Sequence, residues 1–540
     1  MDTAGRKPQV KKVTLSLVTQ RVCNFYVFLY LFLMAAWFPF FLTFGYRNAG
    51  TDKAMLFRFL GLSLLLSVTP CALISGIAKW RKEGTKEFFT KVPDSDWLVL
   101  GYLLVTVLSF LLSDNKEEAF FGAKGWYIGF VTQMIYLMSY FFISRFLRGE
   151  KILLVAFAVS TAVSFTLGIL NRFSLYPLKL EGANPSFIAT LGNINWFCGY
   201  WSVFFPMAVG LFYQAILKKG MAGRVLSGLY LALATMAGAV QGSDSAMLVF
   251  VTVIVVLFCM SCGDIPHRKA FYATLCLLCG ACQVLRVVRM LFPEAMNYDC
   301  RTTELLTGGN VTLFLFFTAF LLWGIFHRRE QNEIGRNRDT NGFLRRERSI
   351  VLVLLAVGVL SFLLLLVRNT RQPGSIGSLS DNPAFTFQEK WGSSRGVTWT
   401  AGLRVFEDMP FGKKLIGLGP DSFAYGVYKE GSSAKEMVVA NFGNSRLTNA
   451  HNEWITVLVN TGILGFLFYL GFFFAKTIRF IKSYLAGRSH SALVLACGLA
   501  LAGYMSHNLF SFQQALNGPL VFIMMGVGEA LLENKAEISL

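Results

Sequence analysis

Long runs of apolar residues recur along this 540-residue chain, and they constrain its fold more than any other feature. The apolar core of a bilayer is about 30 Å thick, so a helix needs about 20 apolar residues to cross it. By this measure the chain holds about fourteen candidate spans, and we predict an all-α, polytopic integral membrane protein. The spans are expected near residues 22–44, 55–78, 97–113, 126–145, 152–170, 196–216, 225–241, 245–262, 270–292, 306–326, 350–367, 454–475, 490–506 and 512–531.

The composition agrees with this fold class. Hydrophobic residues make up 54% of the chain and charged residues only 15%, whereas soluble domains are about 25% charged. These proportions exclude a soluble globular enzyme, a disordered tail protein and a small disulfide scaffold. The first apolar run is too long for a signal peptide and no small-x-small cleavage motif follows it, so we expect it to remain as the first span.

The net charge of +19 leaves three interpretations open: a nucleic-acid partner, an anionic substrate, or basic loops on the cytoplasmic side. If the basic tail 1–21 is cytoplasmic, most of the excess charge falls on that same side, above all in residues 327–348. This matches the positive-inside rule and predicts an even number of spans, with the tail 532–540 also cytoplasmic. A nucleic-acid partner is not favoured, because the basic residues are scattered over loops without interleaved aromatic residues.

Three cysteines, Cys276, Cys279 and Cys282, repeat at a spacing that places them on one side of a helix. They lie in an apolar span with no histidine or carboxylate nearby, where cysteine acts as a small hydrophobic residue. A structural role is therefore favoured over a metal site.

One connection is much longer than the others. Residues 368–453 separate the eleven spans of residues 22–367 from the three spans of residues 454–531, and they are expected on the outer face. Loops of more than about 15 residues are usually functional or disordered. This one is rich in aromatic residues, so we expect it to pack onto the ends of the helices.

The first notable block of the loop runs from Trp391 to Trp399 and leads into a short predicted helix. Ser393 or Ser394 is a suitable N-cap. Arg395 shares a face of this helix with Trp399, whereas Arg404 points to the opposite side. Only one of the two arginines can then face a cavity, and we favour Arg395.

The second block, Thr448–Trp454, lies directly before the span 454–475. It places His451 at the N-terminal end of a membrane helix, where free N–H groups and the helix dipole favour an anion. An imidazole there is available for proton transfer. The alternative is a hydrogen-bonded histidine at the membrane interface.

Further polar residues are expected on the same outer side. Arginine suits a diphosphate because its planar fork holds two oxygens. Each arginine taken alone is more often an interface anchor, and Asp244 alone is more often a turn residue. Few ionisable residues of this chain are expected at mid-membrane depth, whereas coupling transporters place theirs near the midplane. The outer-side candidates are Asn193 and Asn195 before the sixth span, Asp244 between the seventh and eighth, Arg286, Arg289 and Arg301 around the end of the ninth, and His507 between the last two.

Several blocks of the chain resemble the O-antigen ligase and O-antigen polymerase (Wzy-like) superfamily of bacterial membrane glycosyltransferases. They follow the family's order over roughly residues 95–530, and the histidine block with its following glycines is the most specific. The blocks are Phe121–Gly129, Ala189–Trp196, Gln241–Ala246, Trp391–Trp399, Ile416–Phe423, and Asn449–Trp454 continuing into Asn460–Gly465.

The resemblance implies a GT-C-like fold in the bacterial plasma membrane, with the large outer loop lying over a cavity. It implies transfer of a glycan from a polyprenyl diphosphate carrier to a glycan, lipid or protein acceptor, without a nucleotide sugar, a metal or another cofactor. The family's loop histidine corresponds to His451 and its loop arginine to Arg395. Where the family often has Ser-Arg, this chain has Ser243-Asp244, and Arg286 or Arg289 are candidates for the missing arginine. The chain also has about two spans more than the usual twelve.

From these patterns we predict a glycan ligase or polymerase that works on the outer leaflet. Arg395 binds the diphosphate and His451 is the general base for the acceptor hydroxyl or orients it. Further candidates for substrate contacts or for holding the histidine are Asn193, Asn195, Asp244, Trp391, Glu453 and His507. The alternative from another class is a non-enzymatic exporter or flippase of lipid-linked sugars; a structural membrane scaffold has no use for the histidine and arginine blocks.

Overall fold

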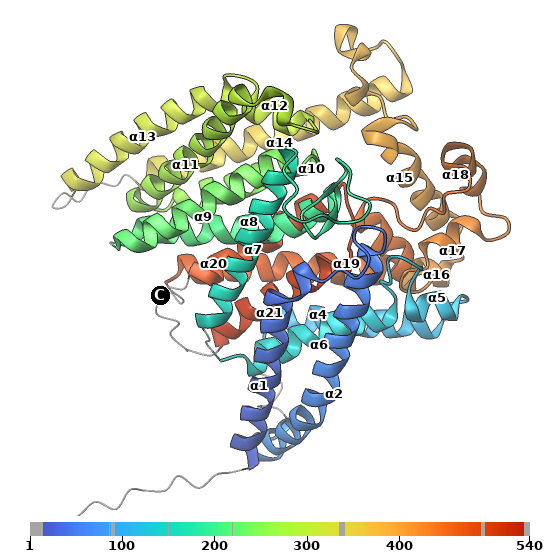
Figure 1. Ribbon diagram of the computed structural model, residues 1–540. Helices are drawn as coiled ribbons and strands as arrows, with labels where there is room; N and C mark the ends of the chain where they lie inside the picture. Colours follow the sequence, from blue (N-terminus) through green and yellow to red (C-terminus); the bar gives the residue numbers. More distant parts are fainter. Residues whose placement is uncertain are drawn as a thin grey trace, which may run out of the picture.

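Figure 1 shows the computed structural model of the chain, which describes residues 15–85, 87, 92–148, 151–218, 220–333, 341–487 and 492–533. Helices dominate these ranges, and the one sheet found in them pairs strand β1 (Phe187–Ile188) antiparallel with β2 (Gly192–Asn193). Ten of the described helices are long and apolar enough to cross a membrane. The prediction of an all-α, polytopic membrane protein is confirmed.

Each predicted span coincides with one helix, although the ends differ by several residues. The fourteen helices among the described residues are α1 (Leu15–Ala36), α2 (Ala49–Glu83), α4 (Asp94–Leu111), α6 (Phe130–Phe146), α7 (Lys151–Arg172), α8 (Ile194–Leu217), α9 (Met221–Val240), α10 (Ser245–Ser261), α11 (Ile265–Leu291), α13 (Val311–Glu333), α14 (Asn341–Arg371), α19 (Glu453–Leu485), α20 (Ala492–His507) and α21 (Gly518–Glu533).

Four of these helices are shorter than the rest of the set. Helices α6 and α10 have 17 residues each, and α20 and α21 have 16 each. They are packed among longer helices, and whether all fourteen cross the membrane stays a prediction.

The predicted tails fall largely outside the described residues. Residues 1–14 and 534–540 are not described, while residues 15–21 belong to α1 and 532–533 to α21. The basic stretch 327–348 is described only at its two ends. The cytoplasmic location of both termini stays a prediction.

The last span starts later than its apolar pattern indicated. Helix α21 begins at Gly518 rather than at residue 512, and residues 508–517 form an irregular segment. The side chain of Asn517 accepts a hydrogen bond from the Gln514 N–H at 2.8 Å, and Pro519 follows directly. Proline is favoured in the first turn of a helix because it needs no N–H acceptor there. Apolar content alone does not show where such a helix starts.

Residues 368–453, named the large outer segment after the side of the membrane predicted for them, are built mostly from short helices with an apolar cluster of their own. Val397, Val405, Leu418, Phe423 and Val438 are buried together in it. Figure 1 shows α15 to α18 gathered on one side of the molecule. The other helices among the described residues are η1 (Phe38–Phe40), α5 (Lys116–Phe121), η2 (Pro293–Ala295), α12 (Arg301–Thr307), η3 (Gly377–Asp381), η4 (Pro383–Phe385), α15 (Trp391–Glu407), α16 (Phe411–Ile416), α17 (Phe423–Tyr428) and α18 (Lys435–Phe442).

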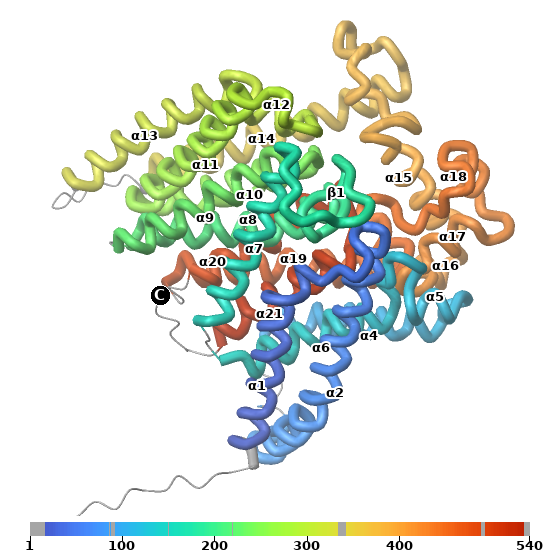
Figure 2. The backbone as a smooth tube through the Cα atoms, viewed as in Figure 1, coloured from blue at the N-terminus to red at the C-terminus, as the bar shows by residue number. Residues whose placement is uncertain are grey.

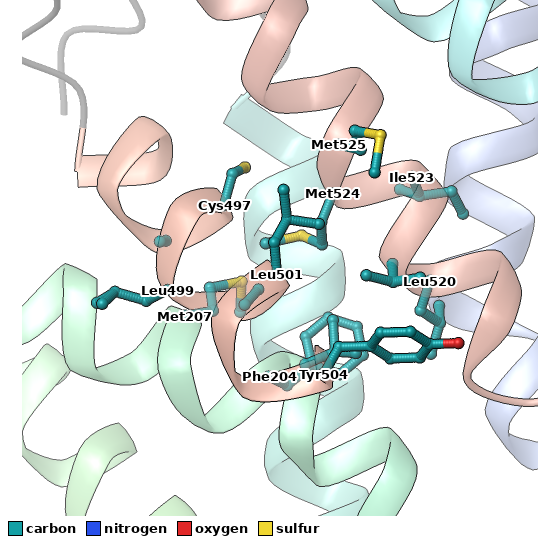
Figure 3. Packing of buried hydrophobic residues seen from close by; sticks show 14 of the residues in the cluster. Phe204, Met207, Cys497, Leu499, Leu501, Tyr504, Leu520, Ile523, Met524 and Met525 are labelled. Atoms are coloured by element: carbon teal, nitrogen blue, oxygen red, sulfur yellow. The ribbon is translucent and has the colours of Figure 1, made fainter. Parts of the chain in front are cut away.

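The main apolar core surrounds α20, which is buried along its whole length. A helix that is apolar on all sides is expected in such a position. Figure 3 shows its side chains Leu501 and Tyr504 among other buried residues, including Phe204 of α8 and Leu520 of α21. Helix α14 is the opposite case, because no residue of its most apolar stretch is buried. Its side chains are available to contact lipid.

A network of buried charges ties four helices together at the ends farther from the outer segment. Lys476 of α19 lies 2.5 Å from Asp96 of α4 and 2.8 Å from Glu529 of α21. All three side chains have no exposed surface. Arg145 of α6 also pairs with Asp96 at 2.5 Å, and Arg479 of α19 with Glu529 at 2.7 Å. Buried charges of this kind are tolerated only when they are paired.

Candidate functional site

His451 lies in a tight turn directly before α19. Its φ of 48° is in the left-handed region, and its N–H donates to Asn449 Oδ1 at 3.0 Å. Asn452 then caps α19, because its Oδ1 accepts the Ile455 N–H at 3.1 Å. Asparagine suits both positions, since its side chain accepts from the backbone nearby. The turn therefore fixes the histidine at the N-terminal end of the helix.

The imidazole of His451 is partly buried and packs edge-on against the Phe512 ring, with 5.2 Å between ring centres. Burial, together with the charge of Arg395, lowers the pKa of His451 to about 4. The ring is therefore neutral at pH 7. Within the described residues neither ring nitrogen has a hydrogen-bond partner from the protein, so both are available to a ligand.

Arg395 is presented by an unusual turn at the start of α15. Gly392, Ser393 and Ser394 all have positive φ, between 60° and 67°, before the right-handed helix continues. The helix has no side-chain cap, so the predicted serine N-cap is wrong. The reason is that both serines are used in the left-handed turn, which aims the next side chain back across the helix start.

The guanidinium of Arg395 is held by backbone oxygens rather than by an acid. Nε and Nη2 donate to Phe510 O at 3.0 and 2.7 Å, and Nη1 donates to Gly392 O at 2.7 Å. A guanidinium has five N–H groups, so one on each terminal nitrogen remains free of protein acceptors among the described residues. Burial lowers the pKa of Arg395, while the charge of Asp244 opposes this shift. The group is thus an arginine with no ion-pair partner among the described residues.

Arg395 and His451 line one cavity of about 450 Å³. No aspartate or glutamate is among the described residues that line it, although it contains two arginines. An arginine-lined cavity without acids favours an anionic ligand. The lining residues are Tyr46, Arg47, Asn48, Gly50, Thr51, Gly125, Trp126, Phe187, Asn193, Asn195, Trp196, Arg395, His451, Phe510, Ser511, Phe512 and Gln514.

Asn193 and Asn195 reach the cavity from the start of α8. Asn193 is the N-cap, and its side chain accepts the Asn195 N–H at 2.9 Å. The β1–β2 hairpin positions this helix start, beside the N-terminal end of α2 (Figure 2). The two asparagines therefore lie together with His451 and Arg395.

A chain of buried hydrogen bonds connects Asn195 to His507. Ser243 Oγ donates to Asn195 Oδ1 at 2.7 Å and lies 2.9 Å from Ser245 Oγ. Ser245 Oγ in turn lies 3.0 Å from His507 Nδ1. Each hydroxyl has one proton, so Ser245 must donate to Ser243 and accept from His507 Nδ1–H. The carbonyl of Asn195 is thereby fixed, which leaves its NH₂ group as the cavity-facing donor. His507 itself is buried and does not line the cavity.

Glu453 does not contact His451. Its carboxylate accepts hydrogen bonds from the hydroxyls of Tyr469 and Tyr504 and from the amide of Asn508, and it borders a separate, small cavity of about 40 Å³. The Glu453 N–H also donates to Asn508 O at 3.0 Å. Glu453 therefore anchors the start of the irregular segment 508–517, whose residue Phe510 holds Arg395.

Trp391 and Asp244 are close to the site but outside the cavity. Trp391 stacks near Phe510, with 6.0 Å between the ring centres, and donates to Ala384 O. Asp244 Oδ1 accepts the Thr302 N–H at 3.0 Å and borders a different cavity, of about 780 Å³.

The structure does not bring Arg286 or Arg289 to the cavity. Arg286 donates to Gly309 O and to Asn310 Oδ1, at 3.2 and 3.0 Å. Arg289 is paired with Asp299 at 2.9 Å and with Glu304 at 3.6 Å. Both arginines hold the connection between α11 and α13, so neither supplies a second cation beside Arg395.

Several cavity residues were missed by the sequence analysis. Arg47 comes from the α1–α2 connection, Gln514 from a stretch that was assigned to a membrane span, and Ser511 from the turn directly before that stretch. Trp126 lies in one of the quoted blocks, but that block gave no reason to place it in the site. Its hairpin is fixed by Asp421, whose Oδ2 accepts the N–H groups of Ala123 and Ile128 at 2.7 and 3.0 Å.

Among the described residues, no group of three His, Cys, Asp or Glu side chains is arranged to hold a metal ion. Cys276, Cys279 and Cys282 lie in α11 as free cysteines.

Comparison with known proteins gives one family match. Residues 303–470 match the family model described as O-antigen ligase (Wzy_C). No curated protein matches the chain. The matched range contains the whole large outer segment, with Arg395 and His451, and three of the blocks noted above. Residues 303–470 are thus similar to the O-antigen ligase family, within a multi-pass membrane protein, and the resemblance to the O-antigen ligase and polymerase superfamily is confirmed over this range.

Proposed function

We propose that the chain transfers a glycan from a polyprenyl diphosphate carrier to an acceptor hydroxyl on the outer side of the membrane. One observation carries this proposal: Arg395, with two free N–H groups, and His451, with a free neutral imidazole, line one cavity that no acid lines among the described residues. The acceptor is a hydroxyl of a glycan, a lipid or a protein. Support from the comparisons is the O-antigen ligase match.

Arg395 is suited to bind the diphosphate. Its guanidinium is already oriented by Phe510 O and Gly392 O, so little side-chain entropy is lost when it binds a phosphate oxygen. Asn195 lines the same cavity at the N-terminal end of α8, where its NH₂ group adds a donor and the helix dipole favours an anion. As the bond from sugar to phosphate breaks, negative charge grows on the leaving diphosphate, and these donors stabilise it.

His451 is suited to take the acceptor proton. In the proposed reaction the acceptor oxygen forms a bond to the anomeric carbon while the bond from that carbon to the phosphate oxygen breaks. The acceptor proton passes to the neutral imidazole, and the electron pair of the broken bond leaves with the lipid diphosphate. A bound diphosphate near the ring raises the pKa of His451 above its value in the empty cavity, which makes the imidazole a better base.

Separate substitutions His451→Ala and Arg395→Ala test these roles. We expect each to lower transfer by roughly 10²–10⁴-fold, the range for loss of a general base or of a key donor to developing charge. The measurements are the length and attachment of the surface polymer in the native host and the transfer rate of the purified protein. Variant protein must be inserted at wild-type levels.

Arg404→Ala is the matched control. Arg404 is on the same helix as Arg395, is exposed, and donates only to Ser433 O at 3.2 Å. Its loss is expected to leave transfer within about twofold, since surface substitutions have small effects. Normal polymer in well-inserted His451→Ala and Arg395→Ala variants would rule out the proposed mechanism.

A further inference from the structure

The second arginine of the cavity, Arg47, comes from the connection between α1 and α2. Residues Tyr46, Arg47, Asn48, Gly50 and Thr51 form one wall of the cavity that holds Arg395 and His451. This wall is in close contact with the opposite side, since a Cβ on Gly50 would lie 2.7 Å from the Trp196 ring. The N-terminal hairpin is therefore part of the site.

The backbone that carries Arg47 is firmly held. The preceding Tyr46 is buried, with its hydroxyl donating to Ala189 O and its N–H donating to Glu181 O at 2.9 Å. Gly45 has a φ of 59°, and a Cβ there would lie 2.5 Å from Glu181 O, so this close approach requires glycine. The backbone at Arg47 is thus fixed at the edge of the cavity.

The side chain of Arg47 is held much less firmly than its backbone. Its only ion pair in the described chain is with Glu181, at 3.0 Å, and the two side chains are 75% and 58% exposed. An exposed pair of this kind contributes little stability, because water and salt screen it. A doubly charged anion in the cavity can therefore displace Glu181 from Arg47 at small cost.

From this geometry we propose that Arg47 is the second cation for the diphosphate group of the donor, which replaces Glu181 as the partner of Arg47. This inference rests on the proposed function. Arg395, partly buried and without an acid partner among the described residues, binds one phosphate, and Arg47 binds the other. The α1–α2 connection then makes the site selective for a diphosphate over a monophosphate.

Binding of undecaprenyl diphosphate and undecaprenyl monophosphate to the detergent-solubilised full chain tests the proposal. We expect Arg47→Ala to weaken diphosphate binding by roughly ten- to one-hundred-fold, as for loss of one charge-assisted contact. Monophosphate binding should stay within about twofold of wild type. The wild-type preference for the diphosphate would therefore be lost.

Two further variants separate a ligand contact from a structural effect. Glu181→Gln frees Arg47 without removing the backbone contacts of residue 181, so diphosphate binding should tighten by a few-fold. Arg446→Ala is the matched control, because Arg446 is half-exposed, pairs with Glu118 at 2.8 Å and does not line the cavity. It should bind both lipids as the wild type does. Inorganic diphosphate as a third probe shows whether the headgroup alone is recognised or whether the lipid is also required.

The outcomes distinguish this inference from the proposed function. If the wild type binds the diphosphate and Arg395→Ala weakens it, but Arg47→Ala binds both lipids as the wild type does, the role of Arg47 is overturned and the proposed function stands. An equal loss of diphosphate and monophosphate binding in Arg47→Ala would also overturn the role in selectivity. If the wild type binds neither lipid, the proposed function itself fails.

Discussion

Arg395 and His451 are both positioned by the irregular segment 508–517. Phe510 O accepts two hydrogen bonds from Arg395, and the Phe512 ring packs against His451. Glu453 anchors the start of this segment through Asn508. A polar group buried without a partner is costly, so these contacts keep the segment in one conformation. The two central residues thus depend on a stretch that contains neither of them.

The low pKa of His451 predicts the acid limb of activity. A general base must be neutral, and with a pKa of about 4 the imidazole of the free enzyme is neutral at every pH above that value. We expect kcat/KM to fall only as the pH drops through about 4, well below the ordinary imidazole value of 6.5. The acid limb of kcat should lie at a higher pH than that of kcat/KM, because the bound diphosphate stabilises the imidazolium.

The pH profile of transfer by the purified protein checks this, provided that the rates are corrected for inactivation. It is best measured in an Asp421→Asn background, since burial raises the pKa of Asp421 to about 7 and its titration would overlap. An acid limb of kcat/KM near 6.5 would contradict the buried, neutral histidine.

At the scale of elements, the hairpin between α5 and α6 carries Trp126 to the cavity and depends on Asp421. The carboxylate of Asp421 accepts the N–H groups of Ala123 and Ile128. We expect Asp421→Ala to destabilise the protein by about 1–3 kcal/mol for each N–H left unpaired. Asp421→Asn keeps an acceptor oxygen in place and should be close to the wild type. Thermal unfolding in detergent compares the two.

The pH dependence of that stability has a defined sign. The pKa of Asp421 is raised in the folded protein from 3.8 to about 7, so the folded state binds more protons between these values. Its contribution to stability is therefore present below about pH 4 and is lost as the pH rises through about 7. Asp421→Asn should remove this part of the pH dependence; an unchanged slope between pH 5 and 7 would show that Asp421 is already ionised there.

The helices could be predicted from sequence because a run of about 20 apolar residues has the length that a helix needs to cross a bilayer. Arg395 and His451 could be found because they stand in polar blocks beside predicted spans. Gln514 could not, since it stands inside an apolar run that looked like the start of a helix, and Ser511 could not, since it directly precedes that run. Arg47 could not either, because a lone arginine after a span is usually an interface anchor, and its nearness to His451 depends on contacts across most of the chain.

At the scale of the whole molecule, the buried charge network and the cavity lie at different places in the helix bundle. Lys476→Met leaves Asp96 and Glu529 without their shared cation, although Arg145 and Arg479 remain. Breaking a buried pair costs about 3–5 kcal/mol, so we expect a marked fall in the free energy of unfolding. The transfer rate per folded molecule should stay near that of the wild type.

The combined variant Asp96→Asn, Lys476→Met, Glu529→Gln tests whether unpaired buried charge causes this fall in stability. Removing the charges together should recover much of the lost stability, as replacing a whole buried ion pair often does. Stability that falls further instead would show that hydrogen bonding and packing at these positions, rather than unpaired charge, set the cost.

A glycosyltransferase forms a glycosidic bond and releases the lipid diphosphate, whereas an exporter moves the lipid-linked sugar intact. The most direct measurement follows the purified chain in proteoliposomes with a lipid-linked glycan donor and an acceptor, and quantifies released polyprenyl diphosphate and transferred glycan together. We expect about one diphosphate released per glycan transferred, and loss of both with His451→Ala. Appearance of the intact lipid-linked glycan on the opposite leaflet, with no release and no difference between wild type and His451→Ala, would contradict it and support an exporter.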